Sequence, residues 1–450
     1  MASVIKLRKG LNLNLAGKAA KVLRDVKPSG TYALVPDDYH GVTPKVVVKP
    51  GDKVKAGDVL FYDKNIPAIK FVSPVSGEVT SVNRGERRKI LSVTVKADGV
   101  VDYKDFGKRN VGAMSGEQVK EAMLEGGVWP FVKQRPYDII ANPNVAPRAI
   151  FVTAFDTKPL APSFDFVLKG READFKTGMK ALGRMAKTYL SMSAAQDLEA
   201  FAEGAETYKF SGPHPAGNVG VQINNIAPVN KGEVVWTLSA WDVLIIGRLF
   251  NDGVADLSRT IAVVGSEVKE PSYANVRIGQ QLGSILAGNL KDGREQRIIS
   301  GNVLTGTKRG LDDFLGAYDT EVTVIPEGND VHEALGWIMP RFDQFSVSRS
   351  YFNWILDPFK RKEYKLDARV KGGERHMIMS HEYDRVLPMS IMPEYLIKAI
   401  IAGDIDRMEA LGIYEVAPED FALCEFVCSS KMELQRIVRD GLDLLYQEMV

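Results

Sequence analysis

The chain has 450 residues, of which 45% are hydrophobic and 26% are charged. This balance is ordinary for a globular protein and excludes a wholly disordered, collagen-like or coiled-coil chain. Its 58 basic and 57 acidic residues leave a formal charge of +1, so the chain lacks the global basic field expected of a nucleic-acid binder. The length suggests about three domains.

The apolar segments and the cysteine content predict a cytoplasmic protein without a membrane span. Segment 1–17 has no continuous apolar core followed by a cleavage site, so we expect no signal peptide. The most apolar stretch, 234–247, is interrupted by Asp242 and is shorter than the ~20 residues that span a bilayer. Two cysteines are too few for a disulfide-rich secreted fold. A peripheral membrane role stays open.

The N-terminal part, residues 28–100, reads as short strands separated by turns. Pro-Gly-Asp at 50–52 and Ser-Gly-Glu at 76–78 are turn sequences, and β-branched residues fill the segments between them. The pattern predicts a small β-barrel or sandwich. Lys64 lies between two strand halves, where a lipoyl or biotinyl lysine would sit, but an ordinary surface lysine is favoured because nothing else supports a modification.

Residues 101–255 alternate between helical and strand patterns, which favours an α/β layer. We expect helices over 116–125, 174–190 and 241–250, and strands over 149–155 and 234–238. Residues 256–330 are richer in strands, with a strand expected at 260–265, strand-and-turn segments at 298–306 and 321–325, and a short helix at 277–286. Aromatic residues crowd 331–380, as in a covered sheet or an extended arm, and helices are expected at 394–402 and 432–446.

Several motifs bear on chemistry. The pair of glycines in 301–306 has the spacing of a phosphate loop, but the lysine does not directly follow the second glycine, so a β-turn is favoured. No G-x-G-x-x-G is present.

Gly126 and Gly127 follow a helical pattern and either cap that helix or approach a ligand, with the cap favoured. A [4Fe–4S] centre needs four thiolates, and this chain has only Cys424 and Cys428, so two free structural thiols are favoured over an intact cluster.

Many residue runs, in order along nearly the full length, are those of one family. They include Lys9-Gly-Leu-Asn-Leu13, Lys70-Phe-Val-Ser-Pro-Val-Ser-Gly77, Ile150-Phe-Val-Thr-Ala154, Gly212-Pro-His-Pro-Ala-Gly217 and Asp420-Phe-Ala-Leu-Cys-Glu-Phe-Val-Cys428. On these runs the chain resembles the A subunit of the Na⁺-translocating NADH:quinone reductase. That family is similar in fold to the NADH-binding subunit of respiratory complex I and to the C subunit of the Rnf complex.

The resemblance implies an α/β plus β multidomain fold. Its expected parts are a lipoyl/biotinyl-like β-domain (1–100), a Rossmann-like α/β domain (101–255), a β-grasp ligand-binding domain (256–330), an aromatic-rich β extension (331–380) and a C-terminal helical domain with a degenerate Fe–S motif (381–450).

Two departures from the redox-active relatives imply that this chain has lost their redox groups. The Gly-rich nucleotide loop is reduced to Gly126 and Gly127, and bulky Trp129 follows where a small residue is needed for close backbone approach to a pyrophosphate. The cluster motif is reduced to Cys424 and Cys428. We therefore expect no cofactor and no metal on this chain, with FAD, FMN, riboflavin and a 2Fe–2S cluster on other subunits.

The resemblance also implies a role in quinone binding and in docking on the membrane-embedded B subunit. The segments 33–39 and 129–137 match those that the family links to ubiquinone or menaquinone, and the candidate contacts are Tyr39, Trp129, Phe131, Arg135, Tyr137 and His214. The chain would sit on the cytoplasmic side of the bacterial inner membrane, within a six-subunit complex that couples NADH oxidation by quinone to Na⁺ export. The alternative is a flavin-dependent NADH dehydrogenase with a working nucleotide site.

Overall fold

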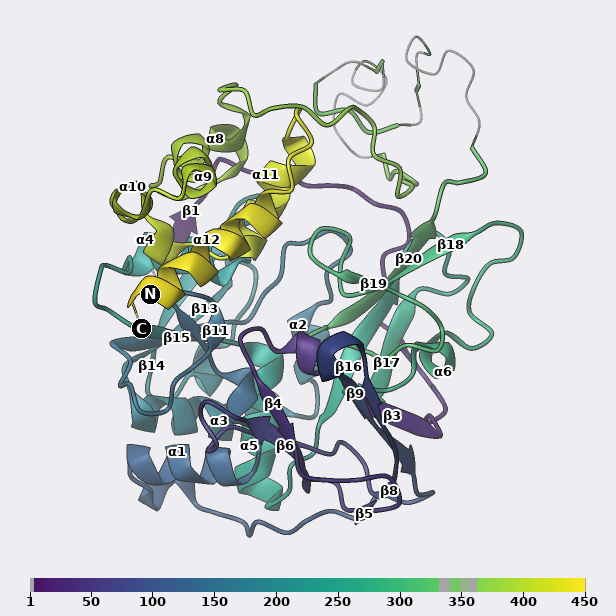
Figure 1. Cartoon of the computed structure of the whole chain (residues 1–450), viewed down its shortest axis with the longest axis vertical. Coiled ribbons are helices and arrows are strands. Elements are labelled where there is room, and N and C mark those ends of the chain that lie inside the picture. The colour runs from purple at the N-terminus through teal and green to yellow at the C-terminus, as the bar shows by residue number, and fades with distance from the viewer. Residues whose placement is uncertain are drawn as a thin grey trace.

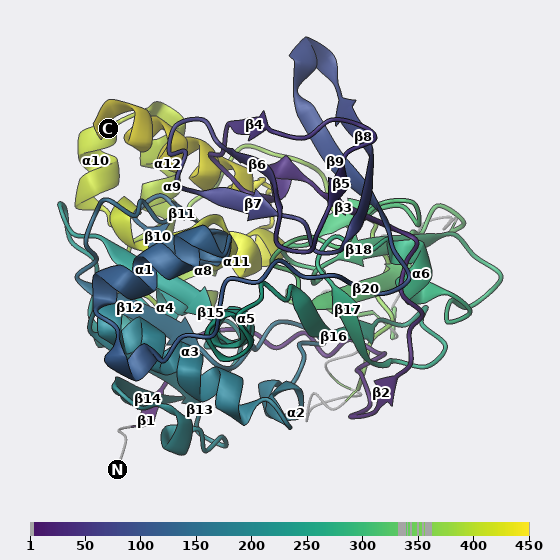
Figure 2. The same ribbon diagram turned by 90° about the horizontal axis from the view of Figure 1, so that it is seen from below.

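The computed structural model describes residues 4–331 and 362–449, together with 339, 341–342, 344–348, 351–352 and 355 between them. The described residues form four β-sheets, of seven, six, four and three strands, with helices packed around them. Figures 1 and 2 show these sheets and helices in two perpendicular views. The predicted mixed α/β multidomain class is confirmed. The labels lipoyl-like, Rossmann-like and β-grasp stay predictions.

The strands between residues 28 and 100 form two small antiparallel sheets. Their bounds are β3 (Thr31–Leu34), β4 (Pro44–Val46), β5 (Lys53–Val54), β6 (Val59–Asp63), β7 (Lys70–Val72), β8 (Gly77–Arg84) and β9 (Ile90–Ala97). One sheet has the order β3-β9-β8-β5 and the other β4-β6-β7. Phe61 and Phe71 are buried and stack with their ring centroids 4.6 Å apart. The hairpin of β8 and β9 projects from the body of the molecule (Figure 2).

The first residues of the chain pair with strands far along the sequence. Strand β1 (Val4–Lys6) lies parallel to β14 (Ala205–Ser211), and β2 (Leu23–Arg24) lies parallel to β17 (Ser272–Arg277). These two strands are edge strands of the seven-stranded and the six-stranded sheet. The N-terminal segment therefore ties the two largest sheets together before it enters the small β-sheets.

The seven-stranded sheet positions the candidate site. Its further strands are β10 (Lys133–Arg135), β11 (Ile139–Ile140), β12 (Ala149–Thr153), β13 (Thr188–Ser193) and β15 (Val235–Ser239). The order is β1-β14-β13-β12-β15-β10-β11, and β12 is parallel to both β13 and β15. From β12 the chain moves outward to β13 and β14 and then returns to β15 on the other side. The strand order therefore reverses between β12 and β15, which is the place where open parallel sheets bind ligands.

Helices cover both faces of this sheet, as in the predicted α/β layer. They are α1 (Gly116–Glu125), α3 (Glu172–Met185), α4 (Val219–Ile226) and α5 (Ala240–Asp252). Successive side chains of a strand face opposite ways, so Ile150 packs in the core of α3 and α5, while Phe151 packs beside α4. Helices α3 and α5 approach closely because Gly247 faces Asp174, whose carbonyl oxygen would lie 1.8 Å from a Cβ there.

The six-stranded sheet has the order β19-β18-β20-β16-β17-β2. Its strands not yet described are β16 (Ser258–Val264), β18 (Gln296–Ser300), β19 (Thr307–Arg309) and β20 (Glu321–Pro326), and the short helix α6 (Leu282–Leu286) packs on it. The β-branched residues Ile261, Val263, Val322 and Val324 are fully buried beneath that helix. This sheet confirms the strand-rich character predicted for 256–330.

The C-terminal part is helical, and it packs beside the seven-stranded sheet (Figure 1). It contains α8 (Glu382–Val386), α9 (Pro393–Ala402), α10 (Ile405–Ala410), α11 (Ala422–Val427) and α12 (Leu434–Met449). These helices share one apolar core, in which Leu396, Leu434 and Leu445 are fully buried. The two C-terminal helices predicted from the sequence are confirmed as α9 and α12.

Two of the predicted helices have wrong bounds. The helix predicted over 174–190 ends at Met185, and Leu190 lies in β13, because the Thr188–Ser193 segment pairs with its neighbours as a buried strand. The short helix predicted over 277–286 covers only its last five residues. Gly279 has φ of 73°, a left-handed conformation that a helix cannot contain.

Much of the aromatic-rich segment 331–380 lies outside the described residues, including Trp337, Trp354 and Phe359. In its described part, Tyr364 forms an isolated parallel bridge with Leu15, and the rings of Phe345 and Tyr364 meet at 5.5 Å. The β extension expected there stays a prediction.

Candidate functional site

A cavity of about 380 Å³ lies where the strand order of the seven-stranded sheet reverses. Thr153 at the end of β12 and Ser239 at the end of β15 both line it. Its volume falls within the ~300–1,000 Å³ of small-molecule sites. Both its position and its size are therefore those of a ligand site.

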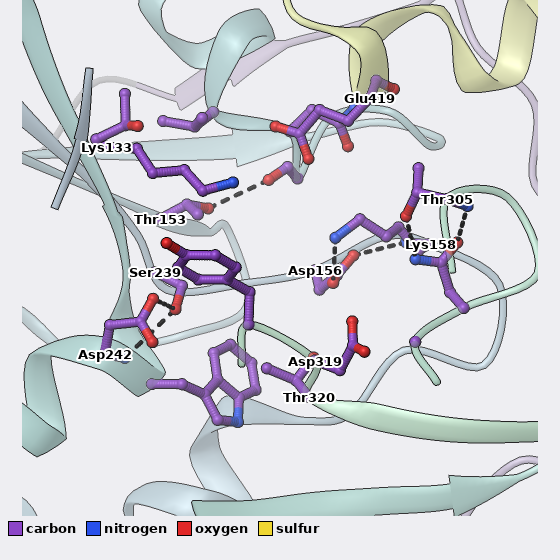
Figure 3. A pocket seen from close by; sticks show the side chains of 18 of the residues that line it. Lys133, Thr153, Asp156, Lys158, Ser239, Asp242, Thr305, Asp319, Thr320 and Glu419 are labelled. Atoms are coloured by element: carbon purple, nitrogen blue, oxygen red, sulfur yellow. Dashed lines mark hydrogen bonds and ion pairs between the residues drawn. The ribbon is translucent and has the colours of Figure 1, made fainter. Parts of the chain in front are cut away.

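Three parts of the chain close this cavity. The α/β part contributes the strand ends and the N-terminus of α4, the six-stranded sheet contributes 301–305 and 318–321, and the C-terminal helical part contributes 418–419 and Gln435. Figure 3 shows Ser239 and Asp242 on one side and Asp156 and Lys158 on the other. A site built between domains can respond to the way these parts pack.

Aromatic rings form one wall of the cavity. Phe131, Tyr318 and Trp241 line it, and the rings of Phe131 and Tyr318 meet edge to face at 6.2 Å. The Tyr318 hydroxyl donates to the carbonyl of Pro130 at 2.6 Å, and the Lys133 ammonium lies 4.4 Å from the centre of the same ring. The anchored rings offer a rigid surface on which a planar ligand can stack.

Acidic side chains outnumber basic ones around the cavity. The lining includes six acidic residues against two lysines, namely Asp138, Asp156, Asp242, Asp319, Glu321 and Glu419 against Lys133 and Lys158. Three acids are paired within it or beside it: Asp156 accepts from Lys158 at 3.0 Å, Asp242 accepts from buried Arg259 at 2.6 Å, and Glu419 lies 3.5 Å from Arg135. This excess of acid opposes the binding of a phosphate-rich ligand.

Burial favours the neutral form of several of these carboxyl groups. Burial raises the pKa of Asp319 and of Asp242. Burial, reinforced by the charge of Asp156, raises the pKa of Glu321 well above its ordinary value. A neutral carboxyl group can donate a hydrogen bond as well as accept one. Burial thus works against the ionised form of these three carboxyl groups.

Of the six quinone contacts predicted from the sequence, Phe131 lines the cavity. Tyr39 and Trp129 are buried and do not line it. The Tyr39 ring meets the Tyr318 ring at 5.7 Å, and the Trp129 indole donates to the carbonyl of Ala141 at 2.8 Å. Tyr39 therefore supports the aromatic wall, whereas Trp129 packs edge to face on Trp236 with the ring centroids 5.1 Å apart.

Arg135, Tyr137 and His214 make contacts within the protein. Arg135 is fully buried and pairs with Asp420 at 2.7 Å, and the Tyr137 ring packs on Tyr446. The His214 ring nitrogen Nδ1 lies 3.1 Å from the hydroxyl of Thr157. Burial lowers the pKa of His214 to about 4, so this ring is neutral at physiological pH.

Gly126 and Gly127 form the end of α1, the favoured sequence interpretation. Gly126 donates its backbone N–H to the carbonyl of Ala122 at 2.9 Å, and Gly127 has φ of 68°. A Cβ on Gly127 would lie 2.3 Å from a methyl group of Val72. The glycines thus allow helix α1 to end against strand β7, and neither residue lines the cavity.

Cys424 and Cys428 are both free and buried. The Cys428 sulfur lies 3.0 Å from the hydroxyl of Tyr383. Within the part of the chain that the structure describes, no group of three or more His, Cys, Asp or Glu side chains is arranged to hold a metal ion. The pair packs in the core of the C-terminal helices.

Of the residues that line the cavity, only Phe131 was predicted from the sequence as a quinone contact. The missed residues include Asp156, Lys158, Asn218, Trp241, Tyr318 and Glu321. One signal was available: Asp156 and Lys158 lie within three residues of the end of the predicted strand 149–155, and Trp241 lies three residues after the predicted strand 234–238. Polar residues just beyond the carboxyl ends of parallel strands are natural ligand contacts.

The fold and the cavity together define a multidomain α/β protein with a cavity where its parts meet, and three domain families match it in order. They are the NqrA N-terminal barrel-sandwich hybrid domain at residues 5–98, the NqrA second alpha/beta domain at 114–255, and the NQRA C-terminal domain at 260–310.

Curated relatives match the chain from end to end. The A subunit of the Na(+)-translocating NADH-quinone reductase from Neisseria meningitidis serogroup A is 38% identical over 99% of this chain and 100% of the relative. Its counterpart from Yersinia pestis is 37% identical with the same coverage. The chain therefore belongs to the family of A subunits of the Na⁺-translocating NADH-quinone reductase, and the resemblance seen in the sequence is confirmed.

Among solved structures, an NAD⁺-reducing [NiFe]-hydrogenase in the air-oxidized state covers 77% of this chain, and the match covers 67% of that chain, at 14% identity and a TM-score of 0.35. A likeness of this size supports no conclusion about function. Among the described residues, no helix has the length and apolar character required to cross a bilayer.

Proposed function

We propose that this chain is a peripheral subunit of a Na⁺-translocating NADH:quinone reductase, on the cytoplasmic side of the membrane, and that its interdomain cavity binds the quinone headgroup. It docks on the membrane-embedded B subunit, and the complex couples NADH oxidation by quinone to Na⁺ export. FAD, FMN, riboflavin and a 2Fe–2S cluster belong to the other subunits. The family relationship supports the assembly, and the cavity supports the quinone site.

The observation that carries the quinone assignment is the pairing of an aromatic wall with hydrogen-bond donors in one cavity. Phe131 and Tyr318 present ring surfaces on which a quinone ring can stack. Lys133 and the indole of Trp241 are donors that line the same space and suit the carbonyl oxygens of the quinone. The excess of acidic residues does not oppose a neutral ligand.

The alternative, a flavin-dependent NADH dehydrogenase, finds less support in the same features. Its pyrophosphate would need backbone N–H groups freed by small residues. Gly126 and Gly127 instead end α1 against side chains of Leu249 and Val72.

Calorimetric titration of the full chain with a short-chain benzoquinone tests the assignment. Phe131→Leu removes one ring of the wall, which is worth ~0.5–1.5 kcal/mol, so we expect Kd to rise about 2- to 10-fold. Phe166→Leu is the matched control, because Phe166 packs on Tyr273 outside the cavity. No binding, or an equal effect of both variants, would contradict the assignment, and tight binding of NADH or flavin would favour the alternative.

A further inference from the structure

The turn that joins β8 to β9 concentrates positive charge. Its residues 84–89, here called the basic tip, read Arg-Gly-Glu-Arg-Arg-Lys and carry four basic side chains against one acidic side chain. The net charge of the tip is therefore +3 in a chain whose formal charge is +1, so the rest of the chain carries −2. All five charged residues are exposed, and the hairpin that bears them projects from the body of the molecule (Figure 2).

Most of this charge is not neutralised within the protein. Lys89 pairs with Asp37 at 2.8 Å, whereas Arg84, Arg87 and Arg88 form no ion pair with any residue that the structure describes. The Arg84 guanidinium donates to the backbone carbonyl of Arg88 at 3.4 Å. Three exposed guanidinium groups are therefore available to anions outside the chain.

The backbone of the tip gives the fold no reason to prefer arginine there. Arg87 and Arg88 have φ of 51° and 62°, a left-handed conformation that asparagine and glycine adopt with less strain. The turn is ordered, since the Gly85 N–H donates to the carbonyl of Lys89 at 2.9 Å. Asn-Gly is the favoured pair for two successive positive φ angles in a hairpin turn. Strained residues of this kind cluster at binding sites.

An apolar side chain lies beside the arginines. Leu91 follows buried Ile90 on β9 and is 44% exposed. A Cβ on Gly85 would lie 3.2 Å from a methyl group of Leu91, so the leucine packs over the tip. Electrostatic attraction together with shallow apolar contact is what holds peripheral proteins on the surface of an anionic bilayer.

We infer that the basic tip contacts the anionic headgroups of the membrane surface. This inference rests on the proposed placement of the chain at the membrane, and it is independent of the quinone site. A projecting tip meets a broad flat surface before the rest of the chain does, whereas an acidic protein partner would need a recess that receives the hairpin. Because the remainder of the chain carries a net −2, an anionic surface attracts the molecule tip first.

Co-sedimentation of the full chain with lipid vesicles tests this contact. The vesicles consist of phosphatidylcholine alone or of phosphatidylcholine mixed with anionic phosphatidylglycerol. We expect binding to the mixed vesicles only, and its loss when salt rises from ~0.1 M to ~1 M, because the Debye length falls from about 10 Å to about 3 Å. Equal binding to both vesicles, or binding to neither, overturns the inference. The quinone site is unaffected by that result, since its calorimetric test uses no membrane.

A double substitution assigns the contact to the tip. Arg87→Asn with Arg88→Gly removes two charges and installs the favoured turn pair, so the free energy of unfolding stays equal or rises. We expect Kd for the mixed vesicles to rise about 10- to 30-fold, since each basic residue near an anionic surface strengthens binding about fivefold. Urea denaturation of the variant shows that any loss of binding is not a loss of folding.

The matched control removes two exposed lysines elsewhere. Lys21→Gln with Lys27→Gln changes residues on either side of β2, which lies on the opposite side of the molecule from the hairpin in Figure 2. The control should change Kd by less than about twofold, because these lysines do not face the membrane in the proposed contact. Equal losses in the two double variants overturn the assignment to the tip.

Purification of the assembled complex separates a lipid contact from a protein contact. The Arg87→Asn, Arg88→Gly chain should copurify with the other subunits as the parent chain does, because the tip faces lipid. Loss of assembly together with unchanged vesicle binding would mean that the tip meets an acidic protein surface, which overturns the inference.

Discussion

Arg135 on β10 and Asp420 in the C-terminal helical part form an ion pair with an N–O distance of 2.7 Å, and both side chains are fully buried. Arg135 also donates to the carbonyl of Glu415 at 3.0 Å, and Asp420 accepts the backbone N–H of Ala417 at 2.9 Å. This pair fastens the C-terminal helices to the sheet that carries the cavity. Glu419, next to Asp420, lines that cavity.

Replacing Arg135 is therefore expected to destabilise the fold. Arg135→Met leaves the Asp420 carboxylate buried without its charge partner, which costs about 3–5 kcal/mol of the free energy of unfolding. Urea denaturation measures the loss. Arg436→Met, which breaks an exposed pair with Glu433, is the control and should change stability little. Equal effects of the two substitutions would show that the buried pair does not hold the domains together.

Gly127 offers a test of the interpretation that it ends a helix. Gly127→Ala places a methyl group against Val72, while Gly170→Ala introduces alanine at a similar φ of 77° with nothing within 4 Å of its Cβ. We expect Gly127→Ala to lower the free energy of unfolding by about 1–3 kcal/mol more than Gly170→Ala, because only the first overpacks the core. Thermal denaturation of both variants measures the difference. A smaller effect at Gly127 would show that this loop is free to approach a ligand.

Gly127 and its neighbour Gly126 also illustrate what sequence reasoning can and cannot reach. The helix predicted over 116–125 has the bounds of α1, because its periodicity and its glycine end are local signals. The packing of Gly127 on Val72 joins two segments that lie far apart in the chain, and no local pattern encodes it. No local pattern encodes the cavity either, because Phe131, Trp241 and Tyr318 are far apart in the sequence and come together only through the topology of the two sheets.

Asp38 predicts a specific pH dependence of stability. Burial raises its pKa to about 7, although Arg309 lies 3.0 Å away. Between about pH 4 and pH 7 the folded chain holds a proton at Asp38 that the unfolded chain has released, so this residue lowers the free energy of unfolding as pH rises. Asp38→Asn removes that contribution, and the stability difference between the variant and the parent chain should grow in favour of the variant across this window.

Urea denaturation at pH 4.5, 5.5 and 6.5 measures this difference, and these values are chosen to fall within the window of about pH 4–7. Asp37→Asn is the control, because Asp37 is exposed and pairs with Lys89 on the surface; its stability difference should stay flat. A flat difference for Asp38→Asn as well would mean that the Asp38 carboxyl is ionised in the folded chain throughout this range.

The two cysteines are expected to behave as structural thiols. Both are buried, and burial raises the pKa of Cys424, which suppresses the reactive thiolate. We expect a thiol reagent to modify the native chain at least ~100-fold more slowly than the urea-unfolded chain, because reaction requires local opening. Cys424→Ser and Cys428→Ser variants assign the rates to single residues. Rapid modification of the native chain would indicate an accessible site for a redox group.

The most direct test of the quinone site is photolabelling of the full chain with a photoreactive short-chain quinone, followed by peptide mapping. The proposed site predicts that the label falls on peptides containing Phe131, Trp241 or Tyr318, and that an excess of the same short-chain quinone without the photoreactive group prevents it. Label confined to the small β-sheets of residues 28–100, or insensitive to that competitor, would contradict a quinone site in the interdomain cavity.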